Sequence, residues 1–213
     1  MNPIYNHIDN HIDNSRGLDI DALFPIDSDT RAELRARLAE AADREGILDI
    51  AYRTVDTPVG PMLLAATDQG LARVAYGRED FDEVLQRLAE RVSPRILRDP
   101  KRLDRAASQF DEYFAGTRRR FDLRLDFRLS SGFRQLVQRF LPQIAYGRTL
   151  TYTQVAEQVG SPKAVRAVGS ACATNPLPVV VPCHRVLRAD GTLGGYIGGL
   201  EVKSALLAME QAA

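Results

Sequence analysis

The chain has 213 residues, of which 45% are hydrophobic and 26% charged, and its formal net charge is zero. This composition is ordinary for a water-soluble protein of one or two domains. No apolar stretch reaches membrane-spanning length, and the N-terminal residues lack the features of a secretory signal, so we expect a cytoplasmic protein without membrane contact. Two cysteines, Cys172 and Cys183, are too few for a disulfide framework and lack metal-site spacing, which predicts reduced thiols and no metal site.

The zero net charge conceals an uneven distribution along the chain. Residues 1–46 carry five arginines against ten acidic residues, whereas residues 131–213 carry eight basic against four acidic residues. A basic C-terminal third favours a polyanionic partner such as nucleic acid, although this signal is weak at such a small excess.

The first segment, residues 1–48, predicts an acidic extension made of a tail and one helix. Its repeat NHIDNHIDN is rich in Asn and Asp, which favours a solvated, disordered tail over a metal site built on His7 and His11. Further along, Thr30 begins a capping box and Gly46 is a plausible stop, so we expect a helix between them.

Residues 49–129 predict an α/β domain with a small antiparallel sheet and helices. The strand-like segments DIAYRTVDT, PMLLAATD and LARVAYG are separated by turn signals, which is typical of a meander. Two helices are expected next, DFDEVLQRLAERV and then a second that ends at Gly116. The alternating segment FDLRLDF, residues 121–127, predicts one more strand.

Residues 130–213 predict a mostly helical domain with a winged-type helix-turn-helix. GFRQLVQRFLPQI is amphipathic, with Leu136 and Val137 on its apolar stripe. In TYTQVAEQVGSPKAVRAVGSACATN, a short helix ends at Gly160 and a second is expected to begin at Pro162. The second helix is rich in small residues, so its backbone could approach a partner closely, but a plain alanine-rich helix explains the same pattern.

The segment VVVPCHRV places Cys183 beside His184 at the end of an apolar, β-branched run. A thiol attacks as its thiolate, and His184 is the only histidine outside the N-terminal tail. Adjacent side chains of a strand point to opposite faces, so a turn at Pro182 or a bridging water is needed to connect the two. Alone, the pair is weak evidence, because a buried free cysteine is most often a small core residue.

The motifs around this pair, taken in order, resemble one family. PCHRV is preceded by NP and an apolar run and followed by GGYIGGLEVKSALLAME, with the helix-turn-helix segment just upstream. This arrangement resembles the O6-alkylguanine-DNA alkyltransferases, also called methylated-DNA–protein-cysteine methyltransferases, over roughly residues 131–210. Residues 49–129 resemble that family's variable N-terminal domain, and residues 1–48 match nothing in its core.

The resemblance implies DNA repair by direct reversal. Cys183 would accept, once only, the alkyl group from O6 of a guanine flipped out of double-stranded DNA, with O4-alkylthymine as a further candidate substrate. His184, acting through water, would remove the thiol proton, and Glu210 would orient the imidazole. Asn175 would be the hinge asparagine, and Tyr152 would help rotate the nucleotide and donate a hydrogen bond to the departing guanine.

The resemblance also implies a base pocket and a DNA-binding face that approaches the minor groove. Arg166 would enter the base stack where the flipped base was. The remaining DNA contacts would come from Thr151, Ala167, Ser170 and Ala173. The pocket walls would be Cys172, Pro178, Val186, Tyr196 and Ile197, with the Val186 backbone reading the base edge. The protein would act as a monomer without a cofactor.

Three residues depart from the family's common pattern. Gln138 stands in place of a tryptophan and Ala145 in place of a proline, while Ile197 is bulkier than the usual residue and predicts poorer handling of bulky adducts. Three rival functions stay open: a lesion-binding alkyltransferase-like protein without transfer activity, a cysteine hydrolase that turns over, and a purely structural role for the motifs. Members of the first class lack the acceptor cysteine, and nothing in the flanking motifs favours the second.

Overall fold

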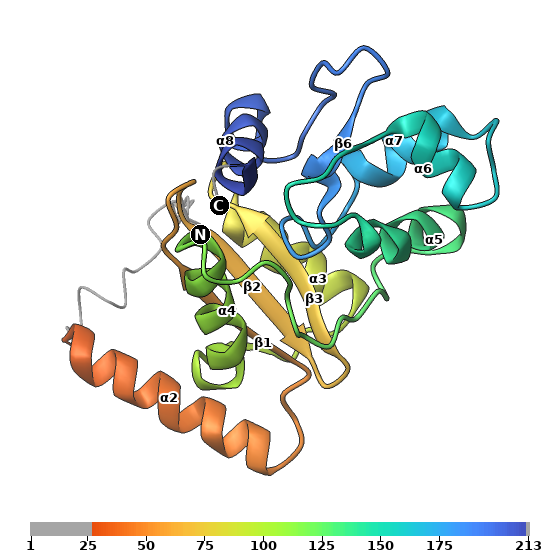
Figure 1. The fold of residues 1–213 in the computed structure, drawn as a ribbon. Helices are drawn as coiled ribbons and strands as arrows, with labels where there is room; N and C mark the ends of the chain where they lie inside the picture. Colours follow the sequence, from red (N-terminus) through yellow and green to blue (C-terminus); the bar gives the residue numbers. More distant parts are fainter. Residues whose placement is uncertain (1–26, 212–213) are drawn as a thin grey trace, which may run out of the picture.

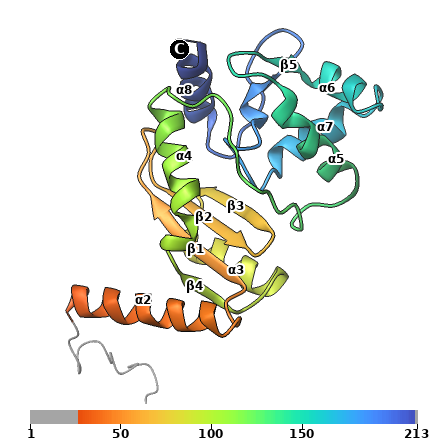
Figure 2. The ribbon, with the colours of Figure 1, turned by 60° about the horizontal axis from the view of Figure 1, so that its bottom comes forward.

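The computed structural model describes residues 27–211, which form an α/β region and a helical region (Figures 1 and 2). The α/β region contains α2 (Ser28–Arg44), β1 (Ile50–Val55), β2 (Met62–Thr67), β3 (Gly70–Tyr76), α3 (Phe81–Arg91), β4 (Ile96–Arg98), the 3-10 turn η1 (Lys101–Leu103) and α4 (Asp104–Phe114). The helical region contains α5 (Gly132–Phe140), η2 (Leu141–Gln143), β5 (Leu150–Thr151), α6 (Tyr152–Gln158), α7 (Val165–Ala173), η3 (Cys183–Arg185), β6 (Val186–Leu187) and α8 (Leu200–Gln211). The repeat that holds His7 and His11 lies outside the described residues. Over residues 27–211, every helix is too short or too polar to cross a bilayer.

The four main strands lie in the order β3-β2-β1-β4. β1, β2 and β3 form the predicted antiparallel meander, but β4 pairs with β1 in parallel, so the sheet is mixed rather than wholly antiparallel. β2 is buried on both faces: Met62 and Leu64 belong to the larger core, and Leu63 and Ala65 to the smaller one. The larger core lies between the sheet and α4, and the smaller core lies between the opposite face of the sheet and α3 (Figure 2).

The strand predicted over residues 121–127 is wrong. This segment makes a single isolated bridge, in which the N–H of Leu71 donates to the carbonyl of Arg124 at 2.9 Å. Further along β3, the N–H of Val74 donates to the carbonyl of Pro176 at 2.8 Å. A loop from the helical region therefore occupies the part of the β3 edge that a longer strand would need, and it joins the two regions.

The helix predicted between Thr30 and Gly46 is present, but its cap differs from expectation. Asp27, not Thr30, caps α2, because its Oδ1 accepts the backbone N–H groups two and three residues on, at 3.0 and 2.8 Å. Ala39 is buried, whereas Leu34 and Leu38, one turn apart, are exposed. In the same way, the buried pair of α5 is Val137 with Gln138, and Leu136 is exposed.

The helix-turn-helix consists of α6 and α7. α6 ends before Gly160, whose φ of +74° suits the turn, as predicted. α7 begins at Val165 rather than at Pro162, because the carbonyl of Ser161 accepts the N–H of Ala164 at 2.8 Å and closes a turn first. Two short parallel strands, β5 and β6, then place the start of α6 beside the segment that carries Cys183.

Candidate active site

Cys183 lies on a 3-10 turn, not on a strand. Pro182 adopts φ −81° and ψ 65°, and the N–H of Cys183 donates to the carbonyl of Val181 at 2.8 Å, which is the geometry of an inverse γ-turn. The expected turn at Pro182 is therefore present. Val179, just before it, has a φ of 73°, a conformation that β-branched residues avoid and that burial holds here.

Asn175 connects α7 to this turn. Its Nδ2 donates to Sγ of Cys183 at 3.1 Å and to the carbonyl of Val181 at 2.8 Å, while its Oδ1 accepts the N–H of Leu177 at 3.0 Å. One buried amide thus fixes both the thiol and the backbone before it. A hydrogen bond from an amide to sulfur favours the thiolate, which is the reactive form.

Glu210 orients His184. The ring Nε2 of His184 lies 2.9 Å from Oε1 of Glu210, and both side chains are buried. Because the carboxylate accepts hydrogen bonds, Nε2 carries the proton and Nδ1 presents its lone pair. That Nδ1 is buried and has no hydrogen-bond partner among the described residues.

Three further groups hold the Glu210 carboxylate. Arg185 donates from Nε at 2.9 Å and from Nη2 at 2.8 Å in a two-pronged ion pair, and the hydroxyl of Tyr113 on α4 donates at 2.7 Å. The N–H of Gly147 donates at 3.2 Å. Tyr113 and Arg185 were not among the predicted site residues, and Tyr113 shows that the α/β region supports the site.

The Cys183 thiol and the His184 imidazole are both uncharged at neutral pH, because burial shifts the pKa of each toward its neutral form. Burial raises the pKa of the Cys183 thiol to about 11, although the Asn175 hydrogen bond and the Lys203 charge act in the opposite direction. Burial lowers the pKa of His184 more than the nearby carboxylate raises it. Burial would raise the pKa of Glu210, but the hydrogen bonds and charges of His184 and Arg185 outweigh it and lower the pKa to about 2. At neutral pH the site therefore holds a thiol, a neutral imidazole and a carboxylate.

Lys203 is a buried cation that the sequence analysis missed. Its side chain is fully buried, and Nζ donates to the carbonyl of Val186 at 2.7 Å. Its charge acts to lower the pKa of Cys183, while burial lowers its own. The available signal was its spacing: Lys203, Leu206 and Glu210 lie at i, i+3 and i+7, on the buried stripe of α8.

The predicted pocket residues differ in how deeply they are buried. Cys172, Pro178 and Val186 are buried, and Tyr196 and Ile197 are half-buried. Tyr196 packs edge-on against His184, with ring centroids 6.3 Å apart. The carbonyl of Val186 accepts from Lys203, so part of the backbone expected to read the base edge already makes a hydrogen bond.

Two further tyrosines contact the segment that carries Tyr196. The hydroxyl of Tyr76 on β3 lies 2.7 Å from that of Tyr196. The hydroxyl of Tyr152 lies so close to Gly194 that a Cβ there would come within 2.2 Å of it. Only glycine fits at position 194 without displacing Tyr152, which explains part of the GGYIGG motif.

Four of the predicted DNA-binding residues lie on α7, and Thr151 lies at the start of α6. Arg166, Ser170 and Ala173 are exposed on α7, and Ala167 is half-buried. Thr151 forms a capping box, in which its hydroxyl accepts the N–H of the third residue of α6 at 3.1 Å, so this side chain also has a structural role. Gln138 lies beneath the surface and donates to a backbone carbonyl of α7 at 3.0 Å, which ties α5 to α7 where the family commonly has tryptophan.

A buried thiol, a histidine hydrogen-bonded to a carboxylate and a helix-turn-helix occur together in this structure, a combination that fits a DNA-binding protein. Residues 50–127 match the model of the 6-O-methylguanine DNA methyltransferase ribonuclease-like domain, and residues 132–212 match that of the 6-O-methylguanine DNA methyltransferase DNA binding domain. The chain belongs to the methylated-DNA–protein-cysteine methyltransferase family, whose activity is the direct reversal of DNA damage.

Individual relatives agree with this assignment. The chain is 42% identical to the methylated-DNA–protein-cysteine methyltransferase of Mycolicibacterium paratuberculosis over 162 residues, which cover 76% of this chain and 93% of that protein. It is 38% identical to the constitutive enzyme of Bacillus subtilis, over 75% of this chain and 94% of that one. A crystal structure of Mycobacterium tuberculosis OGT in complex with DNA matches at 39% identity with a TM-score of 0.67, over 76% of this chain and 93% of that one.

Proposed function

We propose that Cys183 takes the alkyl group from O6 of guanine in duplex DNA. The observation that carries the proposal is a pair of contacts on two adjacent residues: Asn175 donates to the Cys183 thiol, and Glu210 holds His184. In this proposal, residues 49–129 form a supporting domain, residues 130–213 form the DNA-binding and acceptor domain, and residues 1–48 form an acidic extension. The reduced thiol that the reaction needs suits a cytoplasmic compartment.

The transfer is a single displacement at the alkyl carbon. The thiol proton passes through a water molecule to Nδ1 of His184, and Glu210 stabilises the imidazolium that results. Sγ of Cys183 attacks the alkyl carbon, so that a C–S bond forms while the C–O bond breaks and guanine leaves with the bonding electrons. A hydrogen bond from Tyr152 stabilises the departing base. The product is a stable thioether, so each protein molecule reacts once, and the reaction needs no cofactor. O4-alkylthymine contains the same kind of alkyl C–O bond and is a second candidate substrate.

The lesion reaches Cys183 by leaving the base stack. Only 1% of Cys183 is exposed, so a base within a duplex cannot meet it, and extrusion costs about a few kcal/mol. Arg166 fills the gap in the stack, and the small residues of α7 allow a close approach to the minor groove, whose degenerate pattern suits a lesion that occurs in any sequence. Cys172, Pro178, Val186, Tyr196 and Ile197 enclose the base, and one protein molecule acts alone.

The proposal is tested by incubating the protein with duplex DNA that carries one O6-methylguanine. We expect one methyl group per protein molecule, located by peptide mass analysis on the peptide that contains Cys183. Cys183→Ala is expected to abolish transfer while it keeps DNA affinity. Unmodified protein that binds the lesion tightly would indicate a lesion-binding protein instead, and repeated turnover would indicate a hydrolase.

The size of Ile197 is expected to limit the alkyl groups that the pocket accepts. Ile197→Ser removes apolar bulk from the half-buried wall, so we expect the benzyl-to-methyl ratio of single-turnover rates to rise about tenfold, within the range for a few methylene groups in a pocket. The measurement uses duplexes with O6-benzylguanine and O6-methylguanine. Equal rates for the two lesions in the unmodified protein would refute a size limit at this position.

A further inference from the structure

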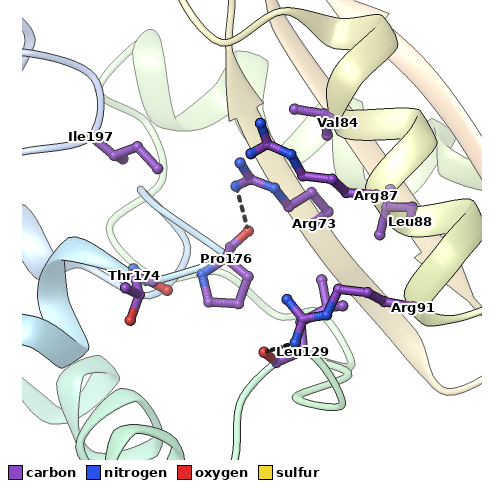
Figure 3. A pocket seen from close by; sticks show the side chains of 10 residues that line it. Arg73, Val84, Arg87, Leu88, Arg91, Leu129, Thr174, Pro176 and Ile197 are labelled. Atoms are coloured by element: carbon purple, nitrogen blue, oxygen red, sulfur yellow. Dashed lines mark hydrogen bonds between the residues drawn. The ribbon is translucent and has the colours of Figure 1, made fainter.

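A cleft with arginines on one side lies between the two regions of the molecule. It has a volume of about 160 Å³ and lies between α3 and the chain that follows α7. Figure 3 shows the arginine side chains pointing from the α/β region toward Thr174, Pro176 and Ile197 of the helical region. The arginines are Arg73, Arg87 and Arg91.

Two of these arginines are available to an external anion. Arg73 is already bound, because it pairs with Glu79 and donates to the carbonyl of Pro176 at 3.2 Å. Arg91 is exposed and donates to the carbonyl of Leu129 at 3.2 Å, and it forms no ion pair with a carboxylate of the described residues. Arg87 pairs with Glu83, but both side chains are more than 60% exposed, and such pairs exchange easily because they contribute little.

The placement of Arg87 and Arg91 on α3 allows both to bind one anion. They lie at i and i+4 on α3, so their side chains share one face of the helix. Like charges at this spacing destabilise a helix slightly, and an anion between or beside them removes that cost. Within α3 the two cations gain nothing from being neighbours.

The cleft continues the exposed surface of α7. The exposed residues Arg166, Ser170, Ala173 and Thr174 follow one another at i, i+4, i+7 and i+8, which is a single stripe along the helix. Thr174 ends the stripe and also lines the cleft. α7 has nine residues, a length of roughly 13 Å, whereas phosphates recur about every 3.4 Å along each DNA strand. A duplex seated on α7 therefore extends past Thr174.

We propose that Arg87 and Arg91 bind a backbone phosphate of the DNA strand that passes the end of α7. The α/β region then contributes directly to DNA binding, in addition to supporting Glu210 through Tyr113. This inference rests on the proposed function, because it takes α7 as the DNA-binding helix. The ligand is a phosphate group, which DNA supplies as a diester and which solution supplies as free inorganic phosphate.

The experiment compares the salt dependence of DNA binding in the full-length chain with that of Arg87→Gln/Arg91→Gln. We expect the slope of log affinity against log salt to become shallower by about 1, or by about 2 if the arginines contact separate phosphates, because each phosphate contact contributes about 0.9. Arg87→Lys/Arg91→Lys, which keeps the charge, is expected to retain the slope. Arg35→Gln/Arg37→Gln, on exposed positions of the distant α2, makes the same charge change and is expected to leave it unaltered (Figure 2).

The outcomes separate this inference from the proposed function. Suppose that the unmodified protein accepts a methyl group on Cys183, but that the slope of log affinity against log salt is the same for it and for Arg87→Gln/Arg91→Gln. The phosphate contact is then refuted and the repair function stands. If the unmodified protein neither binds nor reacts with lesion DNA, the proposed function fails first. Inorganic phosphate is titrated separately, with the melting temperature as the readout. Stabilisation that depends on both arginines, with an unchanged DNA slope, would assign the cleft to free phosphate and overturn the DNA contact.

Discussion

Glu210→Gln is expected to lower the free energy of unfolding by about 3–5 kcal/mol, although glutamine has nearly the same size. Glu210 is 3% exposed, and its carboxylate compensates the charge of Arg185, which is itself buried. Removing one member of a buried ion pair leaves the other charge without compensation, and that is the costly case. Thermal unfolding of this 213-residue chain should show a midpoint lower by roughly 10 °C.

The pH dependence of stability gives a second measurement of the same group. The pKa of Glu210 is about 2 in the folded protein against 4.5 for an ordinary glutamate, so ionised Glu210 favours the folded state. This contribution, roughly 3 kcal/mol, is complete above pH 4.5 and is lost as the pH falls toward 2. The Glu210→Gln protein is expected to lose less stability over that range.

A matched control is available on the same helix. Glu201 is exposed at the start of α8, so Glu201→Gln is expected to change stability by less than about 0.5 kcal/mol and to leave the acid profile intact. Equal effects of the two substitutions would show that loss of a carboxylate from α8, and not the buried network, is responsible.

The sequence predicts those elements of the fold that a local residue pattern determines. It does not predict those that depend on which distant segment pairs with a strand edge. The β1–β3 meander follows from alternation and turn residues close together in the chain. Residues 121–127 have the same alternation, yet Pro176, some fifty positions on, holds part of the edge they would need. The parallel partner β4 has only three residues, too few for a periodic signal.

The site residues also fall into two groups, those that a local motif identifies and those that only the folded chain brings together. Cys183, His184 and Asn175 lie within nine positions of one another, so a motif read in order identifies them. Tyr113 reaches Glu210 across 97 positions, and no local spacing reports such a contact. The burial of Lys203 has no local signal beyond its spacing, because a lysine on an apolar stripe normally reaches solvent, whereas here its ammonium group donates to two backbone carbonyls.

His184→Gln is expected to slow alkyl transfer by about 10²–10⁴-fold at neutral pH and to change the shape of the pH profile. In the proposed mechanism the reacting pair of the unmodified protein is a neutral thiol and a neutral imidazole, and both persist from neutral pH to well above it. Its single-turnover rate with saturating O6-methylguanine duplex should therefore be level between about pH 7 and 9. Without the base, only the thiolate reacts, so the rate should rise tenfold per pH unit toward the thiol pKa of about 11.

Lys203→Met distinguishes the base from the nearby charge. The ammonium group of Lys203 favours the Cys183 thiolate electrostatically, so its loss should slow transfer, yet His184 still accepts the proton and the profile should stay level. A tilted profile for Lys203→Met with a level one for His184→Gln would assign the proton to Lys203 instead. The shape of the profile therefore separates a group that takes the proton from one that only stabilises the anion left behind, a distinction that loss of rate alone cannot make.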